Sequence, residues 1–221
     1  MIFDPEKLDA VSCYKLLIGS VVPRAIGWAS TLSSDGVPNL APFSFFTVVS
    51  RKPPMVSLTM QPKADGQHLK DTLVNIRDTK EFVVNIATLR LTNAMHASST
   101  AFAPEVDEFE AAGLRKIASD LVKPWRVADA PISMECRLEQ ILPMGDVNDH
   151  LVIGRIDTAA LRPVGRLAAE YALIENVFAC PVADEVLERR DPRMHRVDER
   201  DTHWSPLKEA AWSPAGDAKP L

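Results

Sequence analysis

Short runs of apolar and β-branched residues, separated by turn-forming residues, fill most of the chain before residue 160. Such runs are typical of β-strands, because successive side chains on a strand point to opposite faces. The polar segment 33–36, Ser-Ser-Asp-Gly, joins the first two runs and predicts a hairpin. The predicted strands are 26–32, 37–42, 45–49, 55–60, 81–86, 132–142 and 150–158.

A helical period appears in only a few places. Leu69, Leu73 and Ile76 recur at helical spacing with polar residues between them, which predicts an amphipathic helix over 69–78. Shorter helices are predicted over 8–18, 91–98 and 107–112, the last ended by Gly113. Strands therefore outnumber helices, and the pattern excludes a doubly wound parallel sheet. It predicts a mainly β protein, an antiparallel barrel with peripheral helices.

The pattern changes at residue 184. Of the last 38 residues, 184–221, nine are acidic and seven are basic, and several prolines interrupt the segment. We therefore expect a domain over 1–183 and a charged extension over 184–221. Two interpretations of the extension stay open. It is either solvated and partly disordered, or an arm that packs on a second subunit, because Trp204 and Trp212 are costly to leave in water.

The composition and charge of the chain argue against several classes of protein. The 221 residues are 46% hydrophobic and carry a net charge of −5, with both signs interspersed, which argues against a nucleic-acid partner. The three cysteines form no CxxC motif and predict neither a disulfide framework nor a metal site. The N-terminus lacks the features of a signal peptide, and no apolar run is long enough to span a bilayer. We expect a cytoplasmic protein with no membrane partner.

No side-chain constellation for acid–base or nucleophilic catalysis is evident. The sequence contains no GxSxG, HExxH, Walker or GxGxxG motif, and its five histidines are scattered. We therefore predict no catalytic side chain. If the protein is an enzyme, a cofactor supplies the difficult chemistry.

Three segments carry polar groups suited to a ligand. Segment 23–46 alternates hydroxyls, an amide and an arginine with small and aromatic residues, which suits a planar ligand but also an ordinary hairpin. Lys70 and Thr72 stand where the predicted helix begins, which favours an anion but also simple helix capping. His150 follows a turn and is either a ligand contact or a surface residue.

Taken together, these segments resemble the flavin reductase-like family, whose members are FMN-binding split β-barrels. The resemblance runs in order over residues 10–181. The segments that carry it are 23–31, 35–46, 70–76, 81–85, 107–114, 135–138, 149–156 and 165–171.

The resemblance implies a homodimeric FMN-binding split β-barrel of antiparallel Greek-key type. It also implies hydride transfer from NADH or NADPH to flavin, and a partner monooxygenase that receives reduced flavin. The family assigns nicotinamide contact to the position of His150. The residues that the family nominates for cofactor binding are Arg24, Trp28, Ser30, Thr31, Asn39, Ala41, Pro42, Ser44, Lys70 and Thr72.

The chemistry of hydride transfer to flavin is consistent with a site that has no catalytic side chain. Hydride passes directly between the two ring systems, so no protein nucleophile or base is needed. The protein must hold the rings close together and place hydrogen-bond donors where negative charge develops on the flavin. Backbone N–H groups of residues 39–44 are the candidates for those donors.

The sequence departs from the family pattern at a few positions. Ala25 stands for a proline, Gly27 for an alanine, and Ala168 and Ala169 for two glycines. These departures leave open an FMN-binding electron carrier, or a barrel without pyridine-nucleotide activity. A barrel that has lost flavin and acts as a binding module is the third interpretation.

Overall fold

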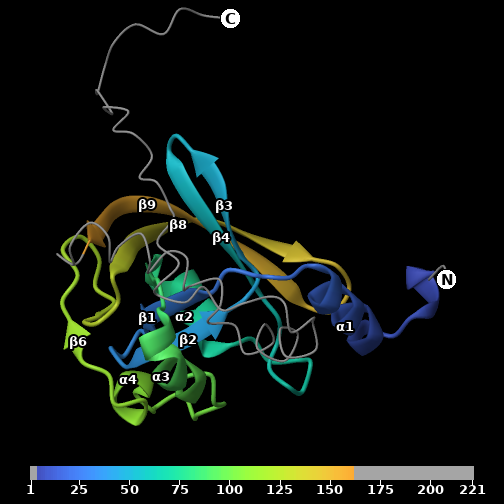
Figure 1. Ribbon diagram of the computed structural model, residues 1–221, viewed down its shortest axis with the longest axis horizontal. Helices are drawn as coiled ribbons and strands as arrows, with labels where there is room; N and C mark the ends of the chain where they lie inside the picture. The colour runs from blue at the N-terminus through green and yellow to red at the C-terminus, as the bar shows by residue number, and fades with distance from the viewer. Residues whose placement is uncertain (1–3, 162–221) are drawn as a thin grey trace, which may run out of the picture. The chain divides into compact units, whose positions relative to one another are not determined.

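The computed structural model describes residues 4–161, which form an antiparallel sheet with helices around it (Figure 1). The sheet has seven strands in the order β2-β1-β5-β8-β9-β4-β3. This confirms the prediction of a mainly β, antiparallel fold. The predicted extension 184–221 and the pair Ala168–Ala169 lie outside the described residues. The strands of the sheet are β1 (Gly27–Leu32), β2 (Pro38–Phe43), β3 (Phe46–Arg51), β4 (Pro54–Met60), β5 (Glu81–Asn85), β8 (Ile132–Met144) and β9 (Asp149–Leu161).

Two strands that are consecutive in the chain stand at opposite ends of this ladder. β2 pairs only with β1, and β3 pairs only with β4, among the described strands. The link between them is Ser44 and Phe45 alone. The curved sheet therefore has an open seam between β2 and β3, closed by the chain and not by a hydrogen-bonded ladder.

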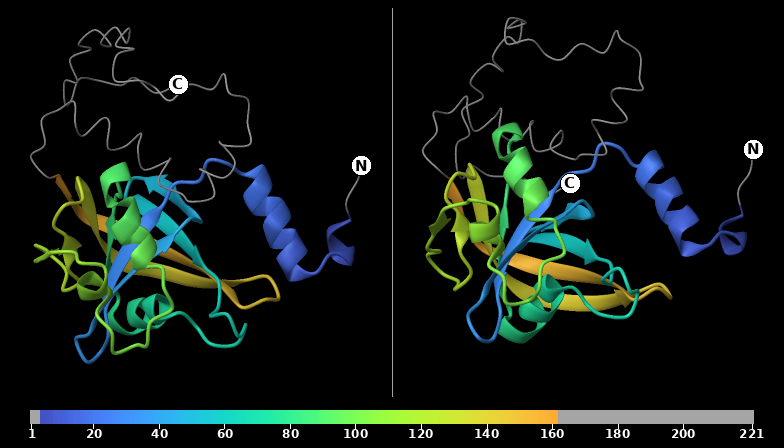
Figure 2. Two further views of the ribbon diagram at one scale, coloured as in Figure 1. Left: turned by 60° about the horizontal axis from the view of Figure 1, so that its bottom comes forward. Right: turned by 90° about the horizontal axis from the view of Figure 1, so that it is seen from below.

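The helices lie outside the sheet (Figure 2). They are α1 (Ala10–Ser20), α2 (Asp71–Thr79), α3 (Thr92–Ala97) and α4 (Glu108–Ala111), with 3-10 turns at Pro5–Lys7 and Leu89–Leu91. Leu73 and Ile76 of α2 are buried, as their spacing predicted. None of the residues of α1 is buried, so the apolar face predicted for 8–18 has no partner in the described part of the chain.

The segment between the predicted helix 107–112 and the predicted strand 132–142 contains a small separate sheet. Strands β6 (Lys116–Ile117) and β7 (Arg126–Val127) pair antiparallel. Two-residue strands are too short to show any alternation, which is why the pattern did not indicate them. None of the helices within residues 4–161 is both long and apolar enough to cross a membrane.

Two apolar clusters hold these layers together, and β1 lies between them. Trp28 of β1 belongs to one cluster, with Leu40 and Phe109. Its neighbour Ala29 belongs to the other, with Leu58 and the members from α2, β5 and β9. Adjacent residues of a strand face opposite sides, so β1 is buried on both faces.

Gly27 is required by close packing. A Cβ atom there would lie 2.6 Å from Cδ2 of Leu58 and 2.8 Å from Cδ2 of Phe46. The ring of Phe46 thus occupies the space that the alanine methyl of the family pattern would fill. This departure from the pattern has a local steric reason.

Candidate functional site

The seam between β2 and β3 exposes backbone hydrogen-bond donors. The N–H groups of Ser44 and Phe45 have no hydrogen-bond partner within residues 4–161. The carbonyl of Phe45 accepts a hydrogen bond from the N–H of Thr59, at 2.9 Å, which holds the link against β4. The hydroxyl oxygen of Ser44 accepts from Nε of Arg24, at 3.4 Å. The seam therefore offers two backbone donors and one hydroxyl, all only partly buried.

Within the described part of the chain, the free edge of β2 offers no further unpaired donors. The N–H of Leu40 donates to Oε2 of Glu108 at 3.1 Å, so it points away from β1. Residues two apart on a strand direct their N–H groups to the same side, which places Pro38 and Pro42 on this edge as well. Proline has no N–H to donate. Of the donors expected over 39–44, only Ser44 lacks a partner among the residues that the structure describes; the rest are paired or are proline.

Behind the seam lies a buried network of polar side chains from β1, β2 and α2. Oδ1 of Asn39 accepts from the hydroxyl of Thr31 at 3.2 Å and from that of Thr72 at 2.7 Å. Nδ2 of Asn75 donates to the hydroxyl of Thr31 at 3.0 Å. Nδ2 of Asn39 donates to Oε1 of Glu108 at 2.7 Å. Three of the residues nominated for cofactor binding are thus bonded to one another inside the protein.

Three other nominated side chains are also engaged within the protein. The indole N–H of Trp28 donates to the hydroxyl of Ser98 at 2.9 Å, and Trp28 is fully buried. The hydroxyl of Ser30 donates to the carbonyl of Trp125 at 2.5 Å. The guanidinium of Arg24 donates to the carbonyl of Ile18 at 2.7 Å and to that of Val21 at 3.0 Å. These contacts tie β1 to neighbouring loops and the end of α1 to the seam.

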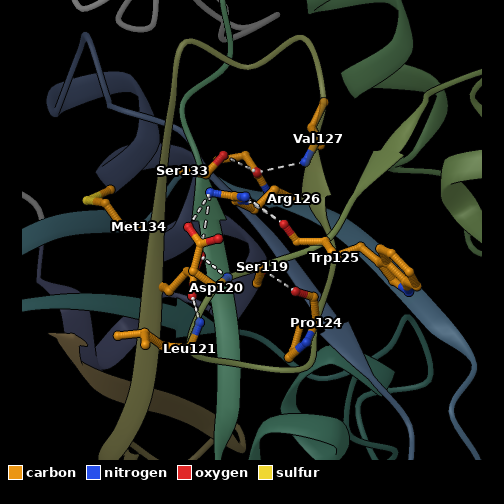
Figure 3. A network of polar contacts seen from close by, with 12 residues as sticks. Ser119, Asp120, Leu121, Pro124, Trp125, Arg126, Val127, Ser133 and Met134 are labelled. Carbon is orange, nitrogen blue, oxygen red and sulfur yellow. Dashed lines mark hydrogen bonds and ion pairs between the residues drawn. The ribbon is translucent and has the colours of Figure 1, made fainter. Parts of the chain in front are cut away.

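The loop 118–127 is held beside β1 by a second network of polar contacts, shown in Figure 3. Glu135 of β8 is fully buried, and its carboxylate accepts from the N–H groups of Asp120 at 2.9 Å and Leu121 at 2.6 Å. The guanidinium of Arg126 lies 3.7 Å from the same carboxylate and donates to the carbonyl of Ala118. The loop that receives Ser30 is therefore fixed by a carboxylate in the sheet.

An uncapped helix start lies next to the buried network. α2 begins at Asp71, and no side chain bonds to its first N–H groups. Such groups carry partial positive charge and favour an anion. Lys70 precedes them and is half-buried, while Asp71 pairs with Lys63 at 2.8 Å. Thr72, 2% exposed, directs its hydroxyl inward to Asn39, so the polar groups left at this end are the backbone and Lys70.

His150 lies at the other end of the loop that leads to Lys70. It pairs with Met60, the residue before loop 61–70, and its Nδ1 lies 3.0 Å from the carbonyl of Asn148. Nδ2 of Asn148 donates to the carbonyl of Gln67 at 3.3 Å, which joins the β8–β9 turn to the loop. His150, which is half-buried, thus lies where loop 61–70 begins, and Lys70 lies where the same loop ends.

Two carboxyl groups near the site have shifted pKa values. Backbone N–H groups of His68 and Gln67, and the His68 ring, lower the pKa of Asp65 to about 2, so this carboxylate holds loop 61–70 together. Burial raises the pKa of Glu108 above its usual value of 4.5. No group of three or more side chains suited to a metal ion occurs within residues 4–161.

Comparisons with known proteins agree with this arrangement. Residues 18–172 match the flavin reductase like domain. The chain belongs to this family. An uncharacterized protein from Aquifex aeolicus is 40% identical over 187 residues, which cover 77% of this chain and 94% of that protein.

Solved structures show the same likeness. Nitrilotriacetate monooxygenase component B from Bacillus cereus is 32% identical with a TM-score of 0.71, covering 74% of this chain and 82% of its own. A 2-nitrobenzoate 2-nitroreductase from Pseudomonas fluorescens is 31% identical with a TM-score of 0.66, covering 73% and 77%. These likenesses confirm the flavin reductase-like family and its split-barrel fold.

The candidate site was only partly visible in the sequence. The sequence indicated the segments that meet at the seam, but not Glu108, Asn75 or Glu135, whose side chains complete the networks. Glu108 lies 69 positions from Asn39 in the chain, and a lone acidic residue on a short helix gives no signal of a distant amide. Asn75 was visible only as part of the polar face of its helix.

Proposed function

We propose that the protein is an FMN-dependent oxidoreductase that transfers hydride from NADH or NADPH to flavin bound at the seam. The observation that carries this proposal is the pair of N–H groups of Ser44 and Phe45 that lack a partner among residues 4–161, at the open edge of a flavin reductase-like barrel. When bound, FMN would supply an acceptor for hydride. No protein nucleophile or general base is needed for that transfer.

The residues at the seam fit a reduced flavin electrostatically. Reduction places negative charge on the pyrimidine side of the ring, and backbone donors fixed in advance stabilise such charge. The N–H groups of Ser44 and Phe45 are the donors that we assign to this role. Ala41 and Pro42 border the seam and offer only small, half-buried surfaces to a ring.

We assign the phosphate of FMN to the start of α2. The uncapped N–H groups there and the ammonium of Lys70 favour an anion together. Asn39, Thr31 and Thr72 support this end of the site by holding β1, β2 and α2 in register, instead of contacting the ligand. Ser30, Trp28 and Arg24 support it in the same way, because their polar atoms are bonded within the protein. We assign nicotinamide contact to His150.

The experiment that tests the function is an anaerobic visible spectrum of the protein with FMN, recorded before and after NADH and then NADPH. We expect the flavin band to bleach faster than that of free FMN with at least one donor. A bound flavin that only dithionite bleaches would favour the electron-carrier alternative. A protein that binds no FMN would overturn the proposal and favour the flavin-free binding module.

A second test concerns the phosphate. Replacing Lys70 with alanine is expected to weaken FMN binding by about tenfold, the effect of about 1.4 kcal/mol, and to leave riboflavin binding unchanged. Lys52→Ala, at an exposed turn, is the matched control. Fluorescence titration measures both ligands. Equal weakening of FMN and riboflavin would contradict the assignment of the phosphate to α2.

The similarity to a monooxygenase component supports a second protein as the acceptor of the reduced flavin. We propose that a partner oxygenase receives the reduced flavin, as the Bacillus cereus relative is a component of such a system by name. The nitroreductase relative supports direct reduction of an aromatic acceptor as the second candidate. Turnover with nitroaromatic compounds but not with free flavin would favour the second.

We also propose that the protein is a homodimer. Val11 and Leu17 of α1 are 61% and 55% exposed, and Val48 and Val49 of β3 are 71% and 49% exposed. The start of β3 lies near α1, because the ring of Phe45, the residue before β3, lies 6.2 Å from that of Tyr14. β3 is also an edge strand that pairs on one side with β4 and on the other side with no strand of the described sheet, and such edges are usually covered. A second copy of the chain packed over α1 and β3 would bury the exposed apolar side chains of both elements.

A further inference from the structure

We propose that Glu108 is a positioning residue that fixes the amide of Asn39 and, through it, the start of α2 where a flavin phosphate would bind. This inference rests on the proposed function. It assigns a role to a side chain that does not contact the ligand.

The direction of the hydrogen bonds makes Glu108 the residue that orients the amide. An ionised carboxylate only accepts hydrogen bonds, so the nitrogen of the Asn39 amide must face it. The amide oxygen then faces the opposite way and accepts from both Thr31 and Thr72. If the amide were flipped, its nitrogen would face the two hydroxyls and its oxygen would face the carboxylate. Glu108 excludes that arrangement because two acceptors repel.

Glu108 also completes the free edge of β2. Its second oxygen accepts the N–H of Leu40, at 3.1 Å, on an edge whose other positions are Pro38 and Pro42. The carboxylate thus holds both the side chain of residue 39 and the backbone of residue 40. With 7% of its surface exposed, Glu108 cannot be replaced by water at these two donors without opening the core.

From Asn39 the effect reaches the first turn of α2 directly through Thr72. The hydroxyl of Thr72, in the first turn of α2, donates to the amide oxygen of Asn39 at 2.7 Å. Lys70 and the uncapped N–H groups belong to the same turn. A reoriented Asn39 would leave Thr72, which is 2% exposed, without its acceptor and would shift this turn.

Among residues 4–161, no basic side chain forms an ion pair with Glu108. Asp107 is the charged neighbour that raises the pKa of Glu108 further, after burial. Lys116 pairs with Asp107 and Glu110 instead. Amide and backbone donors alone therefore stabilise the carboxylate, which explains why its contact to Asn39 is short and directional.

The test is Glu108→Gln, with Glu110→Gln on the same helix as the matched control. An amide at position 108 can present its nitrogen to Asn39 and permit the flip. We expect FMN to bind about tenfold more weakly and riboflavin to bind as before, because only the phosphate end is disturbed. Thermal unfolding of each variant shows whether the fold is intact. Glu110 is exposed and, within residues 4–161, its carboxylate pairs only with Lys116, so its replacement should change neither affinity.

A double variant supplies the rescue. Glu108→Gln combined with Asn39→Asp exchanges donor and acceptor: the introduced amide donates to the introduced carboxylate, whose other oxygen still accepts from Thr31 and Thr72. We expect the ratio of FMN to riboflavin affinity to return to that of the wild type. This variant keeps the proposal testable if the single replacement fails to fold.

The outcomes are distinguishable. If the wild type binds neither ligand, the proposed function fails. If the wild type binds FMN but Glu108→Gln leaves the affinity ratio unchanged, or if it weakens FMN and riboflavin equally, the positioning role is overturned. A folded double variant that keeps the altered ratio of the single variant would also overturn it.

Discussion

Gly154 has no side chain, and this absence leaves room in the core for a buried aromatic ring. It lies in β9 between Val56 of β4 and Leu138 of β8. A Cβ atom there would lie 2.2 Å from Cζ of Phe82, whose ring is 1% exposed. Because the ring is held in a close-packed core, it cannot move aside cheaply. The same reasoning applies to Gly27 and Phe46.

We therefore predict opposite effects for two glycine replacements. Gly154→Ala should lower the free energy of unfolding by about 1–3 kcal/mol, the usual cost of overpacking a core. Gly19→Ala, in α1 with nothing within 4 Å of the added Cβ, should raise it slightly, because alanine favours helix. Urea unfolding measures both. An unchanged midpoint for Gly154→Ala would contradict the close contact with Phe82.

At the level of elements, the sequence predicts a strand or helix correctly where the spacing of its apolar residues is typical of that element. The predicted strands are all present, since each is a run of at least five residues rich in apolar or β-branched side chains. The helix predicted over 69–78 is observed as Asp71–Thr79, because a helix end depends on caps that the apolar period does not include. The β6–β7 pair and the loop beside it were not predicted, because Glu135, a distant residue, holds that loop in place.

The same limit applies to the candidate site. The segments around Asn39, Ser44 and Lys70 could be found from residue types and family likeness. The direction of each side chain could not be found that way, because it depends on partners far away in the chain. Thr72 illustrates this, since its hydroxyl points inward to Asn39 and not toward a ligand.

Glu135 provides a prediction at this scale. Glu135→Gln removes one of the two acceptors that hold the N–H groups of Asp120 and Leu121, and also the charge facing Arg126. We expect a loss of about 1–3 kcal/mol of stability, typical of a buried group left unsatisfied, and faster amide exchange at residues 120 and 121. Glu139→Gln, exposed on the same strand, is the control. Unchanged exchange at both amides would show that the loop is held by other contacts.

At the scale of the whole molecule, the exposed apolar residues of α1 and β3 predict self-association. Val48→Asp should shift the protein toward monomer at a given concentration, because it places a charge in the proposed interface. Ile117→Asp, at a residue that is 47% exposed on β6, should leave the association state unchanged. Sedimentation velocity distinguishes the two. A wild type that is monomeric at all concentrations would remove the basis for the dimer.

The order of strands has a mechanical consequence at the seam. No ladder hydrogen bond joins β2 to β3, so moving these two edges apart breaks none of the bonds between the paired strands. The width of the opening is set by side-chain packing and by the short Ser44–Phe45 tether. The spacing of the two edges can therefore change, by exchange of the side chains between them, while the rest of the sheet keeps its register.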